Sequence, residues 1–367
     1  MKRLSCAVSQ VCTKKATGGI HMIGFRVDAN EEIATGHLMR CIAIAKGFQK
    51  KGEEVLFFLA EEKETQRLKD QNIPYIVLHS KWDNLEQEIP TLKQLLEQHS
   101  ITKLIVDSYQ ATQAYLESLN QSVKVIYMDD MGECLYSIAG VIHYSNWPWD
   151  GTYKKRYEGL DTVCMAGMEY TPLREEFYSL SGVPRKKNIL VTTGGTDQYN
   201  VAGRLLEYVK EKKQEEAKDI WKDVHFLVIS GSMNQNKSYL ENLACENHWI
   251  TLKENVNNMG ELMRDSYLAV SAGGTTLYEL CACKVPTIGF SFADNQEGFT
   301  KEMGEQGILF YAGDARKQED LIEIIYNKLF ELWNDEIMCG QYREKMGQLV
   351  DGKGVDRICN CIMNEIG

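Results

Sequence analysis

No stretch of this sequence approaches the roughly 20 consecutive apolar residues that a membrane-spanning helix needs, so we expect no stable membrane insertion. Basic charge is also scarce: Lys and Arg number 41 against 52 Asp and Glu, a formal net charge of -11. Nucleic-acid binding and broad membrane-surface binding both need a basic face. The composition therefore argues against both kinds of partner and leaves open a local basic spot for a phosphate group.

The cysteine pattern lacks both a disulfide framework and a metal site. The 11 cysteines are scattered, and residues 1–21 contain no apolar run long enough for a secretory signal. A chain of 367 residues buries enough core to fold without cross-links, so we expect reduced thiols and a cytoplasmic location. Cys281 and Cys283 form the closest pair, but no second pair or nearby histidine completes a zinc site. We expect no bound metal and no cofactor.

Short apolar runs alternate with amphipathic stretches of helical length in two series. This rhythm is typical of parallel sheets covered by helices on both faces. The sequence predicts a basic extension at 1–21, an α/β domain at 22–167, a linker at 168–187 rich in turn formers, and a second α/β domain at 188–367. A final helical pattern at about 319–365 could pack back across the pair.

The expected elements follow from apolar periodicity. In the first domain they are strands at 22–29, 54–60, 75–79, 103–109, 124–130 and 140–145, with helices at 36–52, 61–71 and 84–100, the last with a proline near its middle. In the second they are strands at 188–195, 224–230, 250–254, 268–274 and 285–291, with helices at 200–216, 235–247, 258–266, 275–284 and 295–307.

His37 is the only one of the seven histidines that follows a small-residue turn at the start of a predicted helix. Open parallel sheets bind ligands beyond the carboxyl ends of their strands, which is where this residue falls. The positive end of a helix disfavours imidazolium, so a neutral imidazole there can accept a proton from water. A carboxylate such as Asp28 or Asp107 could orient the other ring nitrogen. The alternative is a polar helix cap or a packed polar residue.

Two Gly-Gly turns end predicted strands of the second domain, in "TTGGTD" and "SAGGTT". Glycines let a ligand approach the backbone, and hydroxyl and helix-terminal N–H groups attract an anion. Glu279, three residues after Thr276, either binds both hydroxyls of a ribose or closes a capping box. Neither turn has the spacing of a phosphate loop with its lysine or of G-x-G-x-x-G, which disfavours a nucleoside triphosphatase and a dinucleotide oxidoreductase. Asn295 and Gln296 suit sugar hydroxyls or a neutral base, or form an ordinary turn.

An ordered set of motifs carries a family resemblance. "RVDANEEIATGHLMRCIAIA", "VDSY", "YMDD", "YTPLREEF", "TTGGTD", "SAGGTTLYELCACKVP" and "NQ" resemble, in this order, the UDP-2,4-diacetamido-2,4,6-trideoxy-β-L-altropyranose hydrolases of pseudaminic acid biosynthesis. The superfamily includes spore-coat polysaccharide proteins and, more distantly, resembles the lipid II-forming GlcNAc transferase. The resemblance implies an α/β fold of the GT-B type, with two Rossmann-like domains whose parallel sheets face each other across a cleft.

The resemblance also implies that the second half binds UDP and that the first half presents the catalytic group to the sugar. His37 matches the histidine that activates water for attack at the anomeric carbon, with Tyr109 and Asp107 of "VDSY" beside it. One departure is Ala34, which replaces the first glycine of the usual I-G-x-G-H and puts the exact sugar in doubt. The expected substrate-binding residues are Asp28, Gly36, Arg40, Gly194, Gly195, Thr196, Met259 (at the uracil), Gly273, Gly274, Thr275, Thr276, Glu279 (at the ribose), Asn295 and Gln296.

The sequence thus predicts a metal-independent, monomeric enzyme that hydrolyses a UDP-linked diacetamido-trideoxy sugar to UDP and free sugar, with inversion. UDP is a good leaving group, so no general acid is strictly required. Two alternatives stay open. One is a GT-B glycosyltransferase, whose acceptor groove the aromatic and basic stretch 145–159 could form; this stretch is otherwise a surface loop. The other is a non-catalytic nucleotide-sugar-binding partner, in which His37 would be replaceable without loss.

Overall fold

The structure, a computed structural model of the chain, describes residues 22–28, 36–145, 151–178, 185–215, 223–231, 233–254, 256 and 258–367. The chain forms two compact units, the first Met1–Pro172 with Lys353–Gly367 and the second Leu173–Gly352. Some predicted features lie outside the described residues: the extension 1–21, Ala34 in the first loop, residues 146–150 of the aromatic stretch and residues 179–184 of the linker.

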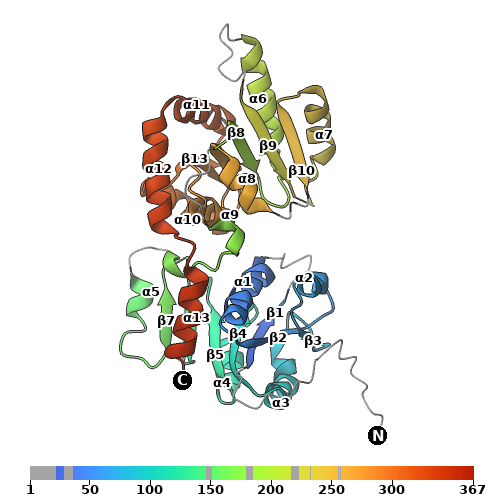
Figure 1. Cartoon of the computed structure of the whole chain (residues 1–367), viewed down its shortest axis with the longest axis vertical. Helices are drawn as coiled ribbons and strands as arrows, with labels where there is room; N and C mark the ends of the chain where they lie inside the picture. Colours follow the sequence, from blue (N-terminus) through green and yellow to red (C-terminus); the bar gives the residue numbers. More distant parts are fainter. Residues whose placement is uncertain are drawn as a thin grey trace. The chain divides into compact units, whose positions relative to one another are not determined.

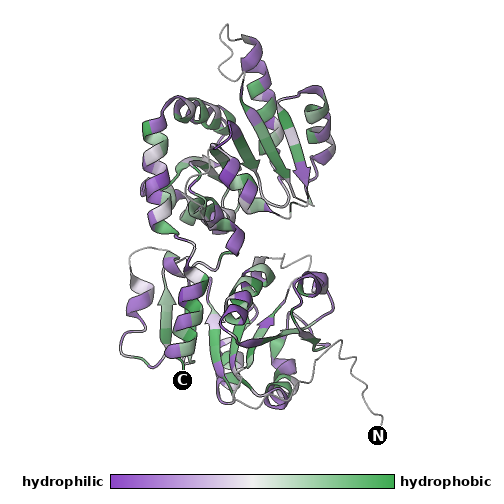
Figure 2. Cartoon of the chain, viewed as in Figure 1, coloured by the Kyte–Doolittle hydropathy of each residue, from purple (hydrophilic) through white to green (hydrophobic). Residues whose placement is uncertain are grey.

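The first unit is built on a seven-stranded parallel sheet with the strand order β3-β2-β1-β4-β5-β6-β7 (Figure 1). Its strands are mostly apolar, as Figure 2 shows, because helices cover both faces of the sheet. The strands are β1 (Met22–Val27), β2 (Glu54–Leu59), β3 (Tyr75–Val77), β4 (Ile101–Asp107), β5 (Lys124–Met128), β6 (Gly140–His143) and β7 (Val163–Ala166).

Aromatic side chains fix the first helix of this unit to the sheet. Phe25 of β1 stacks on Phe57 of β2 with ring centroids 4.7 Å apart, and Phe48 of the first helix meets Phe25 edge-on at 6.4 Å. The opposite face of the sheet packs against α3 and α4 through a separate buried cluster that includes Leu92 and Leu116. The helices are α1 (Gly36–Lys50), α2 (Thr65–Asp70), α3 (Ile89–Gln98), α4 (Gln113–Asn120), α5 (Thr152–Lys155) and α13 (Gly354–Asn364), with 3-10 turns η1 (Leu85–Glu88) and η2 (Met168–Tyr170).

The second unit repeats this design with six parallel strands in the order β10-β9-β8-β11-β12-β13. Its strands are β8 (Asn188–Thr192), β9 (His225–Ser230), β10 (Ile250–Glu254), β11 (Leu268–Ala272), β12 (Thr287–Ser291) and β13 (Phe310–Asp314). Its helices are α6 (Val201–Glu215), α7 (Lys237–Glu246), α8 (Met259–Asp265), α9 (Thr276–Ala282), α10 (Asp294–Glu305), α11 (Leu321–Asn334) and α12 (Glu336–Leu349), with the 3-10 turn η3 (Glu175–Phe177).

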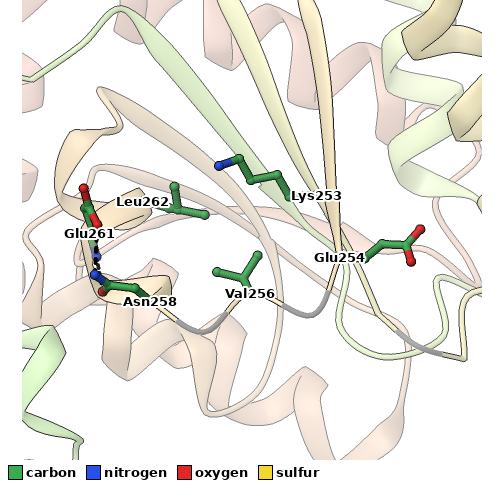
Figure 3. Close-up of a pocket in the computed structure, with 6 residues that line it drawn as sticks. All are labelled: Lys253, Glu254, Val256, Asn258, Glu261 and Leu262. Atoms are coloured by element: carbon green, nitrogen blue, oxygen red, sulfur yellow. Dashed lines mark hydrogen bonds between the residues drawn. The ribbon is translucent and has the colours of Figure 1, made fainter.

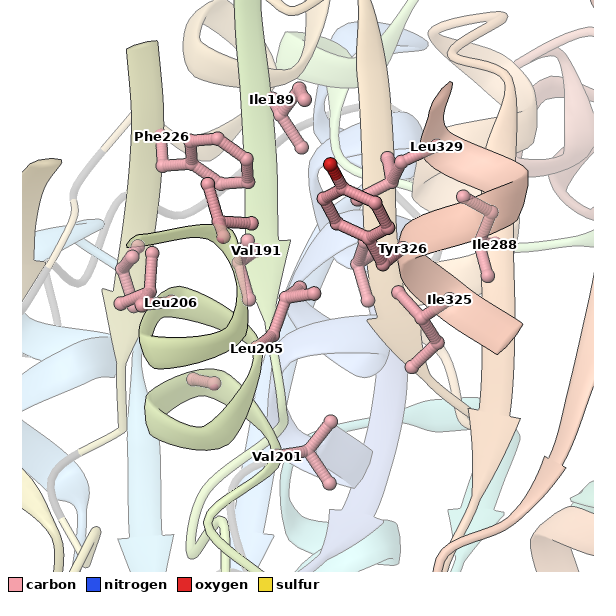
Figure 4. Close-up of a cluster of buried hydrophobic side chains, with 14 of the residues drawn as sticks. Ile189, Val191, Val201, Leu205, Leu206, Phe226, Ile288, Ile325, Tyr326 and Leu329 are labelled. Atoms are coloured by element: carbon pink, nitrogen blue, oxygen red, sulfur yellow. The ribbon is translucent and has the colours of Figure 1, made fainter. Parts of the chain in front are cut away.

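The core of the second unit lies between α6, α11 and the sheet (Figure 4). Leu205 on α6 and Leu329 on α11 are both fully buried against strand residues such as Val191 and Ile288. These positions recur at helical spacing on α6 and α11, which explains why helices form here and which of their faces turns inward. The predicted pair of Rossmann-like halves with parallel sheets is confirmed.

The strand order of each sheet reverses at one point, between β1 and β4 in the first unit and between β8 and β11 in the second. The crevice beyond the carboxyl ends of the strands at such a point is the usual ligand site of open α/β sheets. In the first unit Asp28 and Asp107 lie there, at the ends of β1 and β4. In the second unit the two Gly-Gly turns lie there, after β8 and β11.

The helix predicted over 84–100 starts too early. Residues Leu85–Glu88 form the 3-10 turn η1, and α3 begins at Ile89 with Pro90 in its first turn. Proline lacks an N–H, so it fits the first turn of a helix and breaks the middle. The strands β7 and β13 and the short helices α4 and α5 carry weaker periodicity and were not predicted. Among the described helices, none combines the length and the apolar character needed to cross a membrane.

The helical pattern at about 319–365 is three helices. Asp335 caps α12 by accepting a hydrogen bond from the N–H of Met338, and Gly352 turns the chain with a φ of +77° before α13. The predicted second domain, 188–367, therefore ends too late, because α13 belongs to the first unit. There it packs on α1 so closely that a Cβ on Gly47 would lie 2.4 Å from a methyl group of Val355.

Candidate functional site

The predicted catalytic histidine lies at the start of α1, beside the carboxyl end of β4. His37 is 6% exposed, and its Nδ1 lies 2.7 Å from Oδ1 of Asp107. The ring N–H is not aligned with this oxygen, so the contact is more electrostatic than a linear hydrogen bond. The ring of Tyr109 meets the imidazole edge-on, with centroids 4.5 Å apart. The structure thus brings together His37, Asp107 and Tyr109, the three predicted catalytic residues.

Arg40, one turn further along α1, is fully engaged within the first unit. Its Nε and Nη2 each donate to Asp107 at 2.6 Å. Its Nη1 donates to Asp130 at 2.9 Å and to the hydroxyl of Tyr144 at 2.7 Å, and Nη2 lies 2.8 Å from the other oxygen of Asp130. The guanidinium thus makes four hydrogen bonds and one further close ion-pair contact within the first unit. The predicted role of Arg40 in substrate binding stays a prediction.

The guanidinium of Arg40 sets the charge of the carboxylate next to His37. Burial alone would raise the pKa of Asp107, but Arg40 and His37 outweigh it and hold the pKa well below its ordinary value. The hydroxyl of Tyr109, 55% exposed as a residue, donates to Asp130 at 3.1 Å. Burial of the hydroxyl and the nearby Asp130 raise the pKa of Tyr109. The cluster therefore holds an ionised Asp107 and a neutral tyrosine beside the imidazole.

Asp28 belongs to a different buried cluster, although it was predicted to bind substrate or orient His37. Its Oδ2 accepts a hydrogen bond from Arg26 at 2.6 Å, and its Oδ1 accepts one from the N–H of Ala60 at 2.8 Å. Arg26 is completely buried and also pairs with Glu88 at 2.5 Å. Asp28 thus ties the end of β1 to the end of β2. Gly36, the other predicted binding residue here, is exposed at the first position of α1.

The neighbouring carboxylates of "YMDD" have separate tasks. Asp130 faces Arg40 and Tyr109, whereas Asp129 shapes the turn after β5: it accepts hydrogen bonds from the N–H of Gly132 at 2.9 Å and from the hydroxyl of Tyr153 at 2.8 Å. In the part of the chain that the structure describes, no group of three metal-ligating side chains is arranged to hold an ion. The cluster offers acid–base and electrostatic chemistry.

In the second unit the first Gly-Gly turn, Gly194 and Gly195, is exposed after β8, with Thr196 half-buried behind it. A φ of +79° at Gly194 explains the need for glycine there. The next residue, Asp197, is 2% exposed and accepts hydrogen bonds from the N–H groups of Val201 and Ala202 at the start of α6. The start of α6 is therefore already capped by a carboxylate, and only the glycine turn remains accessible to a diphosphate.

The second turn, Gly273 and Gly274, lies against the segment that follows β12. A Cβ on Gly273 would lie 2.9 Å from Cβ of Gln296, and the side chain of Gln296 accepts a hydrogen bond from the N–H of Phe292. Gly274 has a φ of +138° and open space around it, and Thr275 beside it is exposed. The predicted residues Gly273, Gly274, Thr275, Thr276 and Gln296 thus lie together at one edge of the sheet. Asn295 is exposed at the start of α10.

Glu279, the predicted ribose ligand, lies on α9 with its side chain 20% exposed. Burial raises its pKa to about 7, with Arg174 acting to lower the pKa and Glu176 to raise it. The alternative reading as a capping box partner is not supported, because no side chain caps the start of α9. Glu279 therefore changes between its protonated and ionised forms near neutral pH.

A cavity of about 420 Å³ opens between the end of β10 and the start of α8 (Figure 3). Met259, predicted to lie at the uracil, is the first residue of α8, next to this cavity in the chain. A larger cavity of about 680 Å³ lies in the first unit, lined by the first residues of β1, β2 and β3. It is at the amino edge of that sheet, opposite His37, and has no part in the predicted chemistry. The smaller cavity is lined by Lys253, Glu254, Val256, Asn258, Glu261 and Leu262.

Four residues of these clusters received no role from the sequence. Tyr144 follows β6 directly, so its position at a strand end was an available signal. Asp130 belongs to the motif "YMDD", which was quoted for the resemblance without a role for it. Arg174 and Glu176 lie inside the motif "YTPLREEF", which was quoted for the resemblance without any role for its charged pair.

The comparisons with known proteins agree with this architecture. Residues 188–332 match the Glycosyltransferase family 28 C-terminal domain. The chain is 22% identical over 349 residues to the spore coat polysaccharide biosynthesis protein SpsG of Bacillus subtilis, covering 92% of this chain and 96% of that protein. It is 24% identical over 292 residues to the UDP-2,4-diacetamido-2,4,6-trideoxy-beta-L-altropyranose hydrolase of Campylobacter jejuni, covering 77% and 96%.

An uncharacterized protein of Methanocaldococcus jannaschii is 23% identical over 279 residues, which cover 72% of this chain but span only 54% of that protein. Among solved structures, MurG of Acinetobacter baumannii has a TM-score of 0.62 at 16% identity, covering 94% of this chain and 99% of that one. MnaA of S. aureus, solved with UDP, has a TM-score of 0.64 at 14% identity, covering 93% and 96%. These similarities show a glycosyltransferase-like fold of the GT-B type.

Proposed function

We propose that this protein hydrolyses a UDP-linked diacetamido-trideoxy sugar to UDP and the free sugar. The observation that carries the proposal is the cluster at the switch point of the first unit, where His37 lies 2.7 Å from an Asp107 that Arg40 keeps ionised. An imidazole held by a carboxylate through Nδ1 has Nε2 left to accept a proton. The similarity to the Campylobacter jejuni hydrolase supports this reaction.

The proposed step is a single displacement at the anomeric carbon. Water gives a proton to Nε2 of His37 as its oxygen bonds to that carbon. The bond from the carbon to the β-phosphate oxygen breaks on the opposite side, and UDP leaves with the electron pair. One water is consumed, the anomeric configuration inverts, and the proton passes to solvent. Asp107 stabilises the imidazolium that forms, and Arg40 is a positioning residue for Asp107.

The nucleotide belongs, in this proposal, to the second unit. The turns Gly194–Gly195 and Gly273–Gly274 suit a diphosphate, since neither carries a side chain that would block its approach and only Gly273 of the four is buried. Glu279 suits the ribose hydroxyls and the cavity at the start of α8 suits the base. The match of residues 188–332 to a glycosyltransferase domain and the UDP bound to MnaA support this assignment.

A glycosyl transfer reaction is the second candidate, because SpsG aligns with 92% of this chain and its name ties it to polysaccharide biosynthesis. The nucleotide site would be the same, and a sugar hydroxyl would replace water as the nucleophile. His37 would then accept the proton of that hydroxyl.

UDP release in the absence of an acceptor separates the two reactions. The full chain is incubated with a UDP-linked 2,4-diacetamido-2,4,6-trideoxy sugar and with UDP-N-acetylglucosamine, for wild type, His37→Ala and the control His248→Ala, whose side chain is exposed. We expect release from the diacetamido substrate by wild type and the control, and a rate lower by about 100-fold or more for His37→Ala. In ¹⁸O-water the label should enter the sugar and not the phosphate.

Each other outcome has a definite meaning. Release that requires an added sugar acceptor would establish the transferase instead. Equal release by wild type and His37→Ala would refute the assigned base. Label in the phosphate would refute attack at the anomeric carbon.

A further inference from the structure

The segment at the start of the second unit lies between the two helices of the proposed nucleotide site. The carbonyl oxygen of Glu176 is so close to α8 that a Cβ on Gly260 would lie 2.0 Å from it, and Arg264 of α8 donates to the same oxygen. On the other side, Cys283 after α9 donates to the carbonyl oxygen of Phe177, which is fully buried. The turn η3 therefore fixes α8 and α9 to each other.

Arg174 stands at the start of this turn and reaches α9. Its Nη1 lies 2.5 Å from Oε1 of Glu176, and its guanidinium lies over the ring of Phe177 at 4.8 Å. Its Nη2 lies 3.8 Å from Oε1 of Glu279, within ion-pair range but beyond a hydrogen bond. Glu176 also accepts a long hydrogen bond, 3.4 Å, from the N–H of Gly260. The two carboxylates thus share one arginine.

We propose that Arg174 is a positioning residue of the nucleotide site, which holds the Glu279 carboxylate ionised and in place for the two hydroxyls of a ribose. This inference rests on the proposed function, since it takes the second unit to bind a uridine nucleotide. Two hydroxyl donors need two acceptor oxygens, which an ionised carboxylate provides and a protonated one does not. The affinity for UDP then depends on how strongly Arg174 stabilises the ionised form of Glu279.

The charges around Glu279 give this dependence a direction. Burial raises the pKa of Glu279 to about 7, Arg174 opposes the rise, and Glu176 adds to it. The charged and titratable groups that face it are Arg174 and Glu176 from the η3 segment, Cys283 at the end of α9, and Arg264 of α8, which lies next to Glu176 and Cys283. Removing Arg174 should raise the pKa of Glu279 further, and neutralising Glu176 should lower it.

Arg174→Met and Glu176→Gln should therefore shift the pH dependence of UDP affinity in opposite directions. At pH 7 about half of Glu279 is ionised in wild type, and a rise of about one unit in Arg174→Met would leave about a tenth ionised. Apparent UDP affinity at pH 7 should then fall about fivefold, with little loss at pH 9. Glu176→Gln should strengthen binding between pH 6 and 7. Arg174→Lys retains the positive charge and should restore most of the wild-type pH profile.

The experiment is calorimetric titration of the full chain with UDP from pH 5.5 to 9. Arg343→Met is the matched control, because Arg343 also pairs with a glutamate, Glu336, at 2.5 Å and lies over an aromatic ring at 5.2 Å. Arg343 is not among the groups that shift the pKa of Glu279. The ionisation of UDP itself is the same in every titration, so it cancels when variants are compared. Glu279→Gln should bind weakly and show the least pH dependence.

The outcomes separate the inference from the proposed function. If wild type does not bind UDP, the proposed function fails. If wild type binds but Arg174→Met binds with the wild-type profile, this inference fails alone. An equal loss at every pH in Arg174→Met would also overturn it, because that pattern indicates a direct contact with the nucleotide. A shift of the same size in Arg343→Met would show a general effect of charge and overturn it as well.

Discussion

Replacing Arg40 with leucine would remove the cation that the buried Asp107 and the partly exposed Asp130 share in the first unit. Arg40 makes 2.6 Å hydrogen bonds to both oxygens of Asp107 and further contacts with Asp130 and Tyr144. Asp107 is 1% exposed and Arg40 is 8% exposed, so solvent cannot replace the lost charge at Asp107. Leucine fills much of the space of the aliphatic stem and leaves the electrostatic change as the main one.

The expected cost follows from the burial of this pair. Breaking a buried ion pair by removing one partner costs about 3–5 kcal/mol, because the other charge stays buried without compensation. Without the guanidinium, burial would raise the pKa of Asp107, and a protonated Asp107 would no longer stabilise an imidazolium at His37. Arg40→Leu should therefore lose both stability and the proposed activity.

Urea unfolding with hydrogen exchange measures the stability loss. Hydrogen exchange in peptides from β4 and β5 shows whether the lost stability belongs to the first unit. The control is Arg67→Leu, since Arg67 forms an exposed ion pair with Glu64 on α2 and should cost about 0.5 kcal/mol or less. Arg40→Lys should lie between the two, because an ammonium cannot reproduce a five-donor fork. A loss below about 1 kcal/mol in Arg40→Leu would refute this reasoning.

Two further predictions concern the second unit. Gly260→Ala should lower the free energy of unfolding by about 1–3 kcal/mol, because its Cβ would lie 2.0 Å from a backbone oxygen. Gly340→Ala on α12, where a Cβ would have nothing within 4 Å, should raise it by about 0.5–1 kcal/mol in the same denaturation assay. Equal effects of the two substitutions would contradict the close packing of η3 on α8. Burial raises the pKa of Asp197 from 3.8 to about 6, so the folded state binds this proton more tightly than the unfolded state. The cost of ionising Asp197 in the folded state therefore grows between these two pKa values and is complete above the higher one. Asp197→Asn should gain about 1–3 kcal/mol at about pH 8 and little at about pH 3.5, and a gain that does not depend on pH would contradict the assignment.

The main features of the fold could be predicted because buried parallel strands are continuous apolar runs. Strands such as β4 and β11 and helices such as α1 follow directly from periodicity, within a few residues. The elements that were missed, β7 and β13, are short and have polar or half-buried positions, so their pattern is weak. The final helical pattern allowed for a return across the pair, but it did not show which part would return or what it would pack on. Contacts such as Gly47 against Val355 and the Sγ of Cys359 with the carbonyl oxygen of Ile44 place α13 in the first unit.

The candidate site was predictable to the extent that it follows strand ends. His37, Asp107 and Tyr109 were expected together and lie together. The acceptors around Arg40 were not foreseeable, since helical spacing gives the face of a side chain and not its partners. The partners of Asp28 were not foreseeable for a related reason: Arg26 lies two residues earlier on the same strand, and its second partner Glu88 comes from a distant turn.

The two units hold their carboxylates in different ways, and this difference predicts where a pH response among carboxylates can arise. Asp107 receives two short hydrogen bonds from one arginine, which keeps its pKa far below neutrality. Glu279 has a single arginine at 3.8 Å that it shares with Glu176, and its pKa is about 7. Asp107 therefore stays charged at neutral pH, whereas Glu279 titrates there. For hydrolysis and for transfer, we expect protonation of Glu279 near neutral pH to weaken the proposed nucleotide binding. The ionised Asp107 beside His37 should stay unchanged.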